Sequence, residues 1–518
     1  MAPSVVRDAP RTVALRRPLS IPAPTTKQLL SLYLLVGVVF ATAVGMRLDD
    51  PDMWWHLRTG QLISETHTIP HADPYSFTAP GKAWIAHSWL SDLTFYGASS
   101  VAGFLGVQLL KAVLLTATFA VLLALLRRLT GSQVVAVLAT AIAALVSMVG
   151  WTPRPQLFTF LFSAVFLTVL WRAERENDRL LWALPFVMLL WVNLHGGFVT
   201  GFLLLGAWTV PAGIQWALHR DRSSWRRFRA LLFTVGGCLG VSVLNPWGPR
   251  LWEYPLQYAG SSYHAAYITE WFSPDFHQQS FLPFLMLLLG LLGVLAIGVR
   301  RLSLTEVLLL MGFGYLSLTS ARHIPLFALA TAPTVALQFS AIAASLRREG
   351  VAPLPAASRR VPFLQVANLL LVVFPILWAV GQTPRNGTWA ACGRADSYPI
   401  DAAKALQLFP EPMRMFNNYG WGGFLIHELY PQHRVFIDGR ADMYGADLMD
   451  DYMATSRVQP GWDGVLTKWN IDTVVWPKDW PLSAILRKTS GWDEVYHDRT
   501  ASIFRRAGAA PMMPGRLQ

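Results

Sequence analysis

Three carboxylates and a histidine follow the first long apolar run of the sequence. The run 29–46 is succeeded by Asp49, Asp50 and Asp52, and His56 comes one helical turn later. Acidic side chains beside hydrocarbon are costly unless they bind a cation, a proton or a polar substrate. A carboxylate at this depth can take a proton from a hydroxyl group, or hold a divalent cation against a phosphate. The pattern therefore predicts chemistry on the polar head of a lipid at a membrane face.

Basic side chains lie at the ends of later apolar runs. Arg154 is in the turn 151–156, His195 in 193–197, and Arg322 and His323 in 320–323. A guanidinium offers a planar fork of donors that matches a phosphate. Arg154 and Arg322, together with His195 and His323, are therefore candidates for binding a phosphate. Taken singly, each has a plainer interpretation, such as an arginine that anchors a helix end in the headgroup layer or a histidine satisfied in a tight hairpin. His87, Glu270 and Trp271 are further candidates for substrate contact.

The composition indicates that these residues are carried by a membrane protein. Hydrophobic residues make up 53% of the 518 positions and charged residues only 14%, and the mean hydropathy is +0.36. Such values lie outside the range of soluble globular domains. The two cysteines give neither a metal-ligand spacing nor a disulfide framework.

Eleven membrane spans are predicted from the lengths of the apolar runs. They lie near 29–46, 101–126, 133–150, 156–171, 180–194, 197–217, 230–245, 281–299, 304–320, 324–345 and 362–381. Basic residues precede the first span and occupy every second loop after it, which is the positive-inside pattern. This pattern predicts a cytoplasmic N-terminus and an outer C-terminal segment. The net charge of +12 is then a topology signal, and no nucleic-acid partner is expected.

The predicted organisation is a tail (1–28), a bundle (29–381) and an outer domain (382–518). The first run is too long for a signal-peptide core and no small-residue cleavage site follows it, so it is expected to be an anchor. The long first outer loop, 47–100, is predicted to hold an amphipathic helix at Pro51–Thr66 and a short helix at His87–Tyr96. We expect Trp54, Trp55, Trp84 and Trp89 to hold both helices in the headgroup layer. The alternative is a surface loop that only packs against the bundle.

The segment after residue 382 mixes charged and apolar residues as a soluble domain does. Helices are predicted at 402–408, 422–429, 446–454 and 464–469, and strands at 434–437, 473–476, 494–497 and 501–505. Strands that alternate with helices predict an α/β arrangement. Asp438 and Arg440 directly follow a predicted strand, where α/β folds place binding groups. Their alternative is a turn with an internal Asp–Arg pair.

This combination resembles the type C glycosyltransferases, the polytopic enzymes that use polyprenyl-phosphate-linked sugars. The likeness lies in the acidic motif after an N-in first span, the long first outer loop, the multi-span bundle and the outer α/β domain. It implies a multi-pass protein of the plasma (inner) membrane with a polyprenyl-phosphate-linked sugar as donor and a glycan, lipid or protein as acceptor. Residues 418–422, Asn-Tyr-Gly-Trp-Gly, are loosely similar to the aromatic-Asp-Tyr-Gly motif of oligosaccharyltransferases. They lack its Asp, so peptide recognition is not implied.

The mechanism that the resemblance implies divides the residues into two groups. Asp49 or Asp50 would deprotonate the acceptor, while Arg154, Arg322 and His323 would hold the lipid phosphate. Asp50 and Asp52 could instead hold Mg²⁺ or Mn²⁺ against the phosphate, since hard cations prefer oxygen ligands. The remaining histidines, His56 and His195, would orient either substrate.

Three rival functions stay open: a transporter or flippase, an O-antigen ligase or polymerase, and a scaffold. Transport sites usually lie near the bilayer midplane, whereas the ionisable groups here lie at helix ends. The enzymatic hypothesis requires Asp49, Asp50, Arg154, His195 and Arg322 to meet in one cavity open to lipid and to outer water. The sequence names neither the sugar nor the acceptor.

Overall fold

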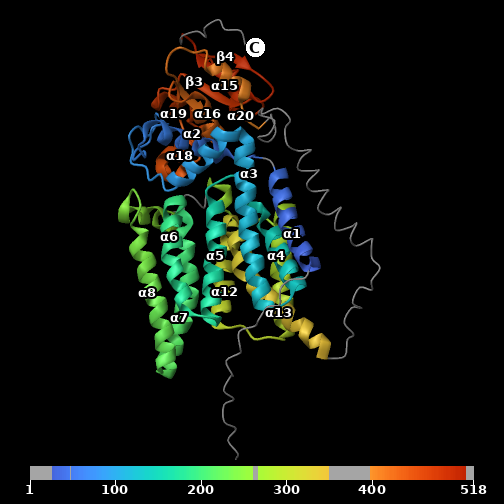
Figure 1. Cartoon of the computed structure of the whole chain (residues 1–518). Helices are drawn as coiled ribbons and strands as arrows, with labels where there is room; N and C mark the ends of the chain where they lie inside the picture. Colours follow the sequence, from blue (N-terminus) through green and yellow to red (C-terminus); the bar gives the residue numbers. More distant parts are fainter. Residues whose placement is uncertain (1–25, 47, 261–266, 349–396, 509–518) are drawn as a thin grey trace, which may run out of the picture.

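A computed structural model describes residues 26–46, 48–260, 267–348 and 397–508 of the chain. A helical bundle forms its larger part. A smaller domain that contains a sheet, the sheet domain (397–508), lies at one end of the bundle (Figure 1). Six helical segments in the described ranges are long and apolar enough to cross a membrane: Trp89–Thr130, Gln133–Gly150, Gln156–Arg175, Gly196–His219, Gln279–Ile297 and Ala321–Leu346. Val36–Gly45 and Leu304–Thr319 are shorter apolar helices. The count of eleven spans stays a prediction, and the span 362–381 lies outside the described residues.

The bundle consists of helices that are joined by short turns, except where the first loop and the segment 243–281 intervene. The helices are α1 (Thr26–Gly45), α3 (Trp89–Thr130), α4 (Gln133–Ser147), α5 (Gln156–Arg175), α6 (Ala183–Leu194), α7 (Val199–His219), α8 (Arg222–Ser242), α11 (Leu282–Ile297), α12 (Leu304–Thr319) and α13 (Ile324–Arg348). α3 breaks at Ala102–Gly103, where Gly103 has a positive φ of 59° that favours glycine. The predicted short helix at His87–Tyr96 and the span 101–126 are therefore two parts of one element.

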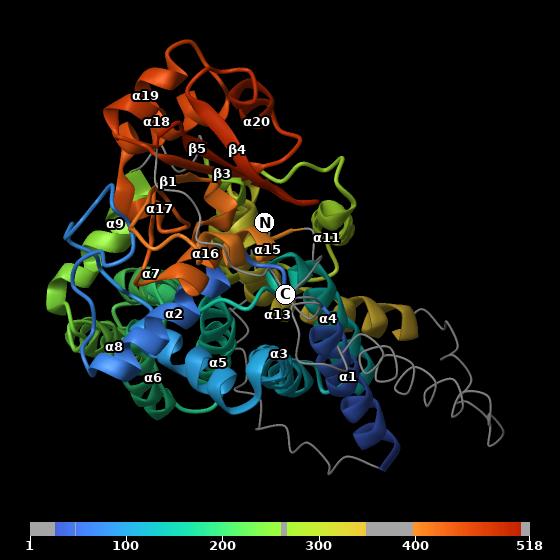
Figure 2. The ribbon, with the colours of Figure 1, turned by 90° about the horizontal axis from the view of Figure 1, so that it is seen from above.

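The predicted loop helix is confirmed as α2 (Pro51–Thr66). Asp50 caps it, since its carboxylate accepts a hydrogen bond from Asp52 N at 2.9 Å, and Pro51 occupies the first helical position. In the view from above, α2 lies beside α16 (Gly422–Leu429) of the smaller domain (Figure 2).

The expectation that the loop tryptophans lie in the headgroup layer is wrong for three of them. Trp54, Trp55 and Trp84 are buried, with 0%, 5% and 3% of their surfaces exposed. The ring of Trp54 packs edge-on against Phe424 at a centroid distance of 5.2 Å. The smaller domain covers these rings and so removes them from contact with lipid or water.

The smaller domain is built on a five-stranded sheet in the order β2-β1-β3-β5-β4. The strands are β1 (Arg414–Asn417), β2 (Arg434–Val435), β3 (Thr473–Pro477), β4 (Trp492–His497) and β5 (Ala501–Arg506), and the helices include α15 (Ile400–Leu406), α17 (Ala441–Tyr444), α18 (Ala446–Ser456), α19 (Trp462–Lys468) and α20 (Pro481–Leu486). β1 runs parallel to β2 and β3, while β5 is antiparallel to β3 and β4. The predicted α/β arrangement is confirmed; β1 is the strand that the pattern missed.

The first loop and the sheet form one body, because the loop adds to the open edge of β2. Ser76 bridges Val435 in parallel register, and Val435 N donates to Tyr75 O while Phe77 N donates to Val435 O, both at 3.1 Å. The hydroxyl of Thr78 adds a bond of 2.6 Å to Phe436 O. An exposed sheet edge is thereby covered.

Candidate active site

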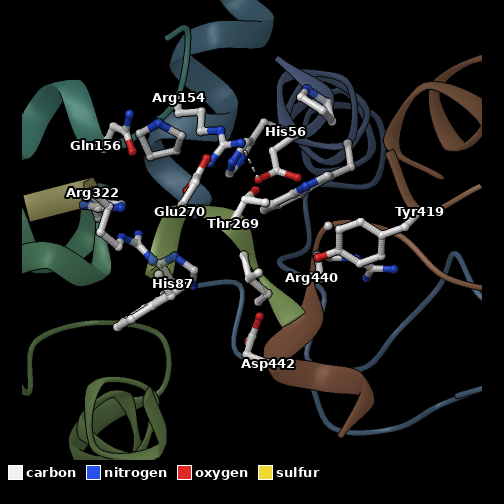
Figure 3. Close-up of a pocket in the computed structure, with 18 of the residues that line it drawn as sticks. His56, His87, Arg154, Gln156, Thr269, Glu270, Arg322, Tyr419, Arg440 and Asp442 are labelled. Atoms are coloured by element: carbon white, nitrogen blue, oxygen red, sulfur yellow. Dashed lines mark ion pairs between the residues drawn. The ribbon is translucent and has the colours of Figure 1, made fainter. Parts of the chain in front are cut away.

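A cavity of about 390 Å³ lies where the bundle, the first loop and the sheet domain meet (Figure 3). Nine predicted site residues line it: Asp52, His56, His87, Arg154, His195, Glu270, Trp271, Arg322 and Arg440. Four others do not: Asp49, Asp50, His323 and Asp438. Side chains distant in sequence therefore meet at one cavity. Of the three acids that follow the first apolar run, Asp49, Asp50 and Asp52, Asp52 is the one that lines it.

Arg154 uses all three of its guanidinium nitrogens on carboxylates. Its Nε lies 2.6 Å from Asp50 Oδ1, Nη2 lies 3.2 Å from Asp52 Oδ2, and Nη1 lies 2.7 Å from Glu270 Oε1. The Arg154 side chain retains only 15% exposure. This geometry suits a residue that orients acids better than one that binds the phosphate of a substrate.

Asp52 and Glu270 share Arg154 but differ in protonation. Burial raises the pKa of Asp52 to about 7, against the opposing effect of Arg154. Burial also acts to raise the pKa of Glu270, but Arg154 and Arg322 outweigh it, so that this pKa is lowered. Glu270 therefore stays ionised at neutral pH, whereas Asp52 is poised between accepting and releasing a proton.

The acidic cluster does not fit the predicted Mg²⁺ or Mn²⁺ site. Within the described ranges, no group of three or more His, Cys, Asp or Glu side chains is arranged to hold a metal ion. Asp50 Oδ1 caps α2 and pairs with Arg154, and Asp52 pairs with the same guanidinium. Arg154 thus already supplies the positive charge between these carboxylates.

His195 is fixed in one tautomer by its neighbours. Its Nδ1 lies 3.1 Å from the donating Gly197 N–H and 2.7 Å from the Thr159 hydroxyl. That hydroxyl accepts a bond from Trp191 Nε1 at 2.9 Å, so its own proton is free to go to His195. Nδ1 is an acceptor, and burial holds the pKa of His195 well below its usual value. The ring proton is therefore on Nε2, which makes this cavity-lining ring a hydrogen-bond donor.

His56 is held by the carboxylate of Asp92, which was not among the predicted site residues. Its Nδ1 lies 2.6 Å from Asp92 Oδ1, and both side chains are buried. Ser88 donates to the same oxygen at 3.1 Å. Burial, followed by Arg154, holds the pKa of His56 well below its usual value. The available signal was an aspartate in the first turn of a long apolar helix, where an acid is costly without a partner.

Of the three arginines among the described residues that line the first cavity, Arg322 is the one that remains available to a ligand, since Arg154 and Arg440 are paired with carboxylates. The Arg322 guanidinium stacks over Trp271 at 4.7 Å, and among the described residues it forms no ion pair with a carboxylate. Arg322 also lines a second, mainly apolar cavity of about 280 Å³, as do His195 and Trp271. His323, predicted beside it, lines only this second cavity.

The second cavity continues into an apolar groove between α7 and α12. The groove, of about 390 Å³, shares Leu203, Phe313 and Leu316 with the second cavity and is also lined by Gly312. The first cavity, lined by Asp52 and Glu270 and called the acidic cavity below, shares Arg322 with the second cavity, and the second cavity shares residues with the groove. The three openings are therefore adjacent and lead from the acidic cavity to the apolar surface of the bundle. Such a path suits an amphiphile with an anionic head.

Asp438 and Arg440 form the internal pair that was the alternative to a binding role. Arg440 donates to Asp438 from Nε at 2.8 Å and from Nη2 at 2.7 Å, and its Nη1 lies 2.8 Å from Asp73 of the first loop. The guanidinium also contacts the rings of Tyr75 and Trp84 at 4.9 and 4.7 Å. This buried network joins the loop to the sheet domain.

Replacing Arg440 by Met is expected to destabilise the protein by about 3–5 kcal/mol, because the buried carboxylates of Asp73 and Asp438 would lose their cationic partner. The measurement is thermal unfolding of the detergent-purified protein. The matched control is Arg487→Met, which breaks a surface pair with Glu494 and should cost about 1 kcal/mol or less. Equal shifts for the two variants would contradict the prediction.

Comparison with solved structures gives the class of fold. AglB from Archaeoglobus fulgidus, an archaeal oligosaccharyltransferase in complex with an inhibitory peptide and a dolichol-phosphate, matches with a TM-score of 0.53 and 13% identity over 94% of this chain and 75% of AglB. ArnT from Cupriavidus metallidurans bound to undecaprenyl phosphate matches with a TM-score of 0.50 and 17% identity over 94% of this chain and all (100%) of ArnT. ArnT from the same organism in the apo state matches with a TM-score of 0.51 and 16% identity over 92% of this chain and 98% of ArnT. The fold is therefore that of the type C glycosyltransferases, which are multi-pass membrane proteins.

The likeness to this class is one of structure. No protein-family model matches the sequence, and no curated protein sequence matches it. At such low identity the likeness establishes the fold, and the chemistry has to be argued from the side chains of the cavity.

Proposed function

We propose that this protein is a membrane glycosyltransferase that moves a sugar from a polyprenyl-phosphate donor to an acceptor on the extracytoplasmic face. The observation that carries the proposal is the junction at Arg322. There a cavity that holds a proton-accepting carboxylate opens into an apolar groove. The fold is consistent with this assignment, and the sheet domain then lies outside the cytoplasm.

The donor lipid is assigned to the groove and its phosphate to the junction. Arg322 provides a guanidinium that forms no ion pair with a carboxylate of the described residues, and His195 provides an Nε2–H donor from the same wall. Both groups stabilise the negative charge that develops on the phosphate as the sugar leaves. Arg154, committed to three acids, is assigned a positioning role.

Asp52 is assigned as the base. The acceptor hydroxyl gives its proton to Asp52 while its oxygen forms a bond to C1 of the sugar. The bond from C1 to the phosphate oxygen breaks, and the polyprenyl phosphate leaves with the electron pair. A carboxylate with a pKa of about 7 is well matched to this transfer at neutral pH.

A further opening on the sheet domain supports a separate route for the acceptor. A cleft of about 330 Å³ is lined by Tyr267, Tyr452, Trp480 and Arg457, and it shares Tyr419 and Gly420 with the acidic cavity. Aromatic rings and a cation suit a polar acceptor such as a glycan. Donor and acceptor would then approach Asp52 from opposite sides.

The proposal is tested by reconstituting the purified protein in vesicles that contain polyprenyl-phosphate-linked sugars. Release of free polyprenyl phosphate together with a labelled glycan, lipid or protein product is the expected result. A transporter or flippase would move the intact lipid-linked sugar without breaking the C1–O bond. A ligase-like activity would instead require a diphosphate-linked donor.

Filling the groove should weaken donor use. Gly312→Phe places a ring in open space on the groove wall, since nothing lies within 4 Å of a Cβ there, and we expect KM for the lipid donor to rise at least about tenfold, or about 1.4 kcal/mol. Gly236→Phe on α8 is the matched control, because its Cβ position is equally open and lies outside the groove. An unchanged KM in the Gly312 variant would remove the groove from the donor site.

A further inference from the structure

Two glycines of the sheet domain touch the start of the helix that carries Asp52. A Cβ added to Gly439 would overlap Asp52 Oδ1 and would stand 3.4 Å from Asp52 Oδ2. A Cβ added to Gly423 would overlap the carbonyl oxygen of Pro51. These contacts give Gly423 and Gly439 a structural role beside the helix that carries Asp52.

The turn that carries Gly439 has rigid support on both sides. Asn417 accepts a bond from Phe436 N at 2.8 Å and donates to Ile437 O at 2.9 Å, which fixes the segment before the turn. Beyond it, the bidentate Arg440–Asp438 pair and the Arg440–Asp73 pair hold the turn against the first loop. Tyr444 adds a short hydrogen bond to Asp438.

Asp52 is therefore enclosed between two fixed groups. Its Oδ2 faces the Arg154 guanidinium at 3.2 Å, and its Oδ1 abuts the backbone of the Gly439 turn. With an added Cβ at position 439, the carboxylate would have to rotate or the helix start would have to shift. Catalytic groups usually need to be held within about 0.5 Å of their productive position.

We propose that Gly439 is a positioning residue: the turn 438–440 of the C-terminal domain is a backbone wall that sets the carboxylate of Asp52 against Arg154. This inference rests on the proposed function insofar as Asp52 is the base. It makes the sheet domain a part of the catalytic site.

Gly439→Ala tests the proposal. Displacement of Asp52 from Arg154 removes a charge that lowers its pKa, so we expect kcat to fall at least tenfold and the acid limb of the pH–rate profile to move to higher pH. KM for the lipid donor should stay within twofold, because Arg322 and the groove are unaffected. The matched control is Gly464→Ala on α19, where nothing lies within 4 Å of the added Cβ and wild-type kinetics are expected. Wild-type kcat and an unshifted pH profile in Gly439→Ala would overturn the proposal.

A thermal-stability cycle tests the same contact without any activity assay. The melting temperature is measured for the wild type, Gly439→Ala, Asp52→Ala and the double variant. Since Asp52→Ala removes the atoms that the new Cβ would meet, Gly439→Ala should lower the melting temperature in the wild-type background and much less in the Asp52→Ala background. An equal loss in both backgrounds would show that Gly439 contacts something other than Asp52, and the proposal would fail. If the wild type transfers no sugar, the proposed function fails, while this cycle still reports on the contact.

Discussion

Asp52→Asn is expected to reduce sugar transfer by about 10³-fold, because an amide has no basic oxygen to take the acceptor's proton. The amide keeps the size of the carboxylate and can still contact Arg154, so the fold should persist. The measurement is kcat with a polyprenyl-phosphate-linked sugar in detergent or vesicles. Asp49→Asn is the comparison, since that side chain is exposed and outside the cavity, and it should keep its rate within about twofold.

The pH dependence of the wild type follows from the same residue. A base must be ionised, and burial raises the pKa of Asp52 to about 7. The rate should therefore fall about tenfold per unit below pH 7 and level off above it. A wild-type profile that is flat from pH 5 to 8, or an Asp52→Asn variant that retains activity, would exclude Asp52 as the base.

Arg322→Met is expected to lower kcat/KM for the lipid donor by about 10²–10³-fold, because the developing phosphate charge would lose its guanidinium. Methionine preserves much of the apolar contact with Trp271, so the wall of the junction should remain packed. Binding of polyprenyl phosphate, measured directly on the purified protein, should weaken in parallel. The effect should be graded, with Arg322→Lys intermediate, since an ammonium keeps the charge but loses the planar fork.

The control for this substitution is Arg250→Met. Arg250 is exposed and pairs only weakly with Glu253, at 3.4 Å. It lies in the segment 243–281, which also contains Glu270. It should behave as the wild type in both assays. Equal losses in the two variants would indicate a general effect of positive charge on the protein surface, and the phosphate site at the junction would be wrong.

Much of the architecture follows from local pattern. Apolar runs predict the long helices, and the Asp50–Pro51 cap signal sets the start of α2 at the predicted residue. The alternation of helices and strands after residue 396 gives four of the five strands. β1 was not predicted because its four residues, Arg-Met-Phe-Asn, carry little strand signal. They form a strand by pairing with β2 and β3.

The candidate site was predictable in kind but not in assignment. The acids, the histidines and the arginines at the ends of apolar runs were identified by the cost of placing them beside hydrocarbon. The role of each depended on partners more than a hundred positions away, such as Arg154 with Asp50 and Asp52. Asp92 stayed unnoticed because only packing shows that it buries a carboxylate against His56.

The sequence by itself determined that this chain is a helical membrane bundle with an α/β domain and an acidic motif after its first span, because hydrophobic length, charge placement and cap residues act locally. Only the tertiary structure decided which of Asp49, Asp50 and Asp52 lines the cavity, which arginine stays available and that the Gly439 turn of the sheet domain lies against Asp52. Asp50 turns inward as the cap of α2, and Asp52 then points across at Arg154 and Gly439. Those choices depend on side chains from separate elements meeting in one place, which no local pattern encodes.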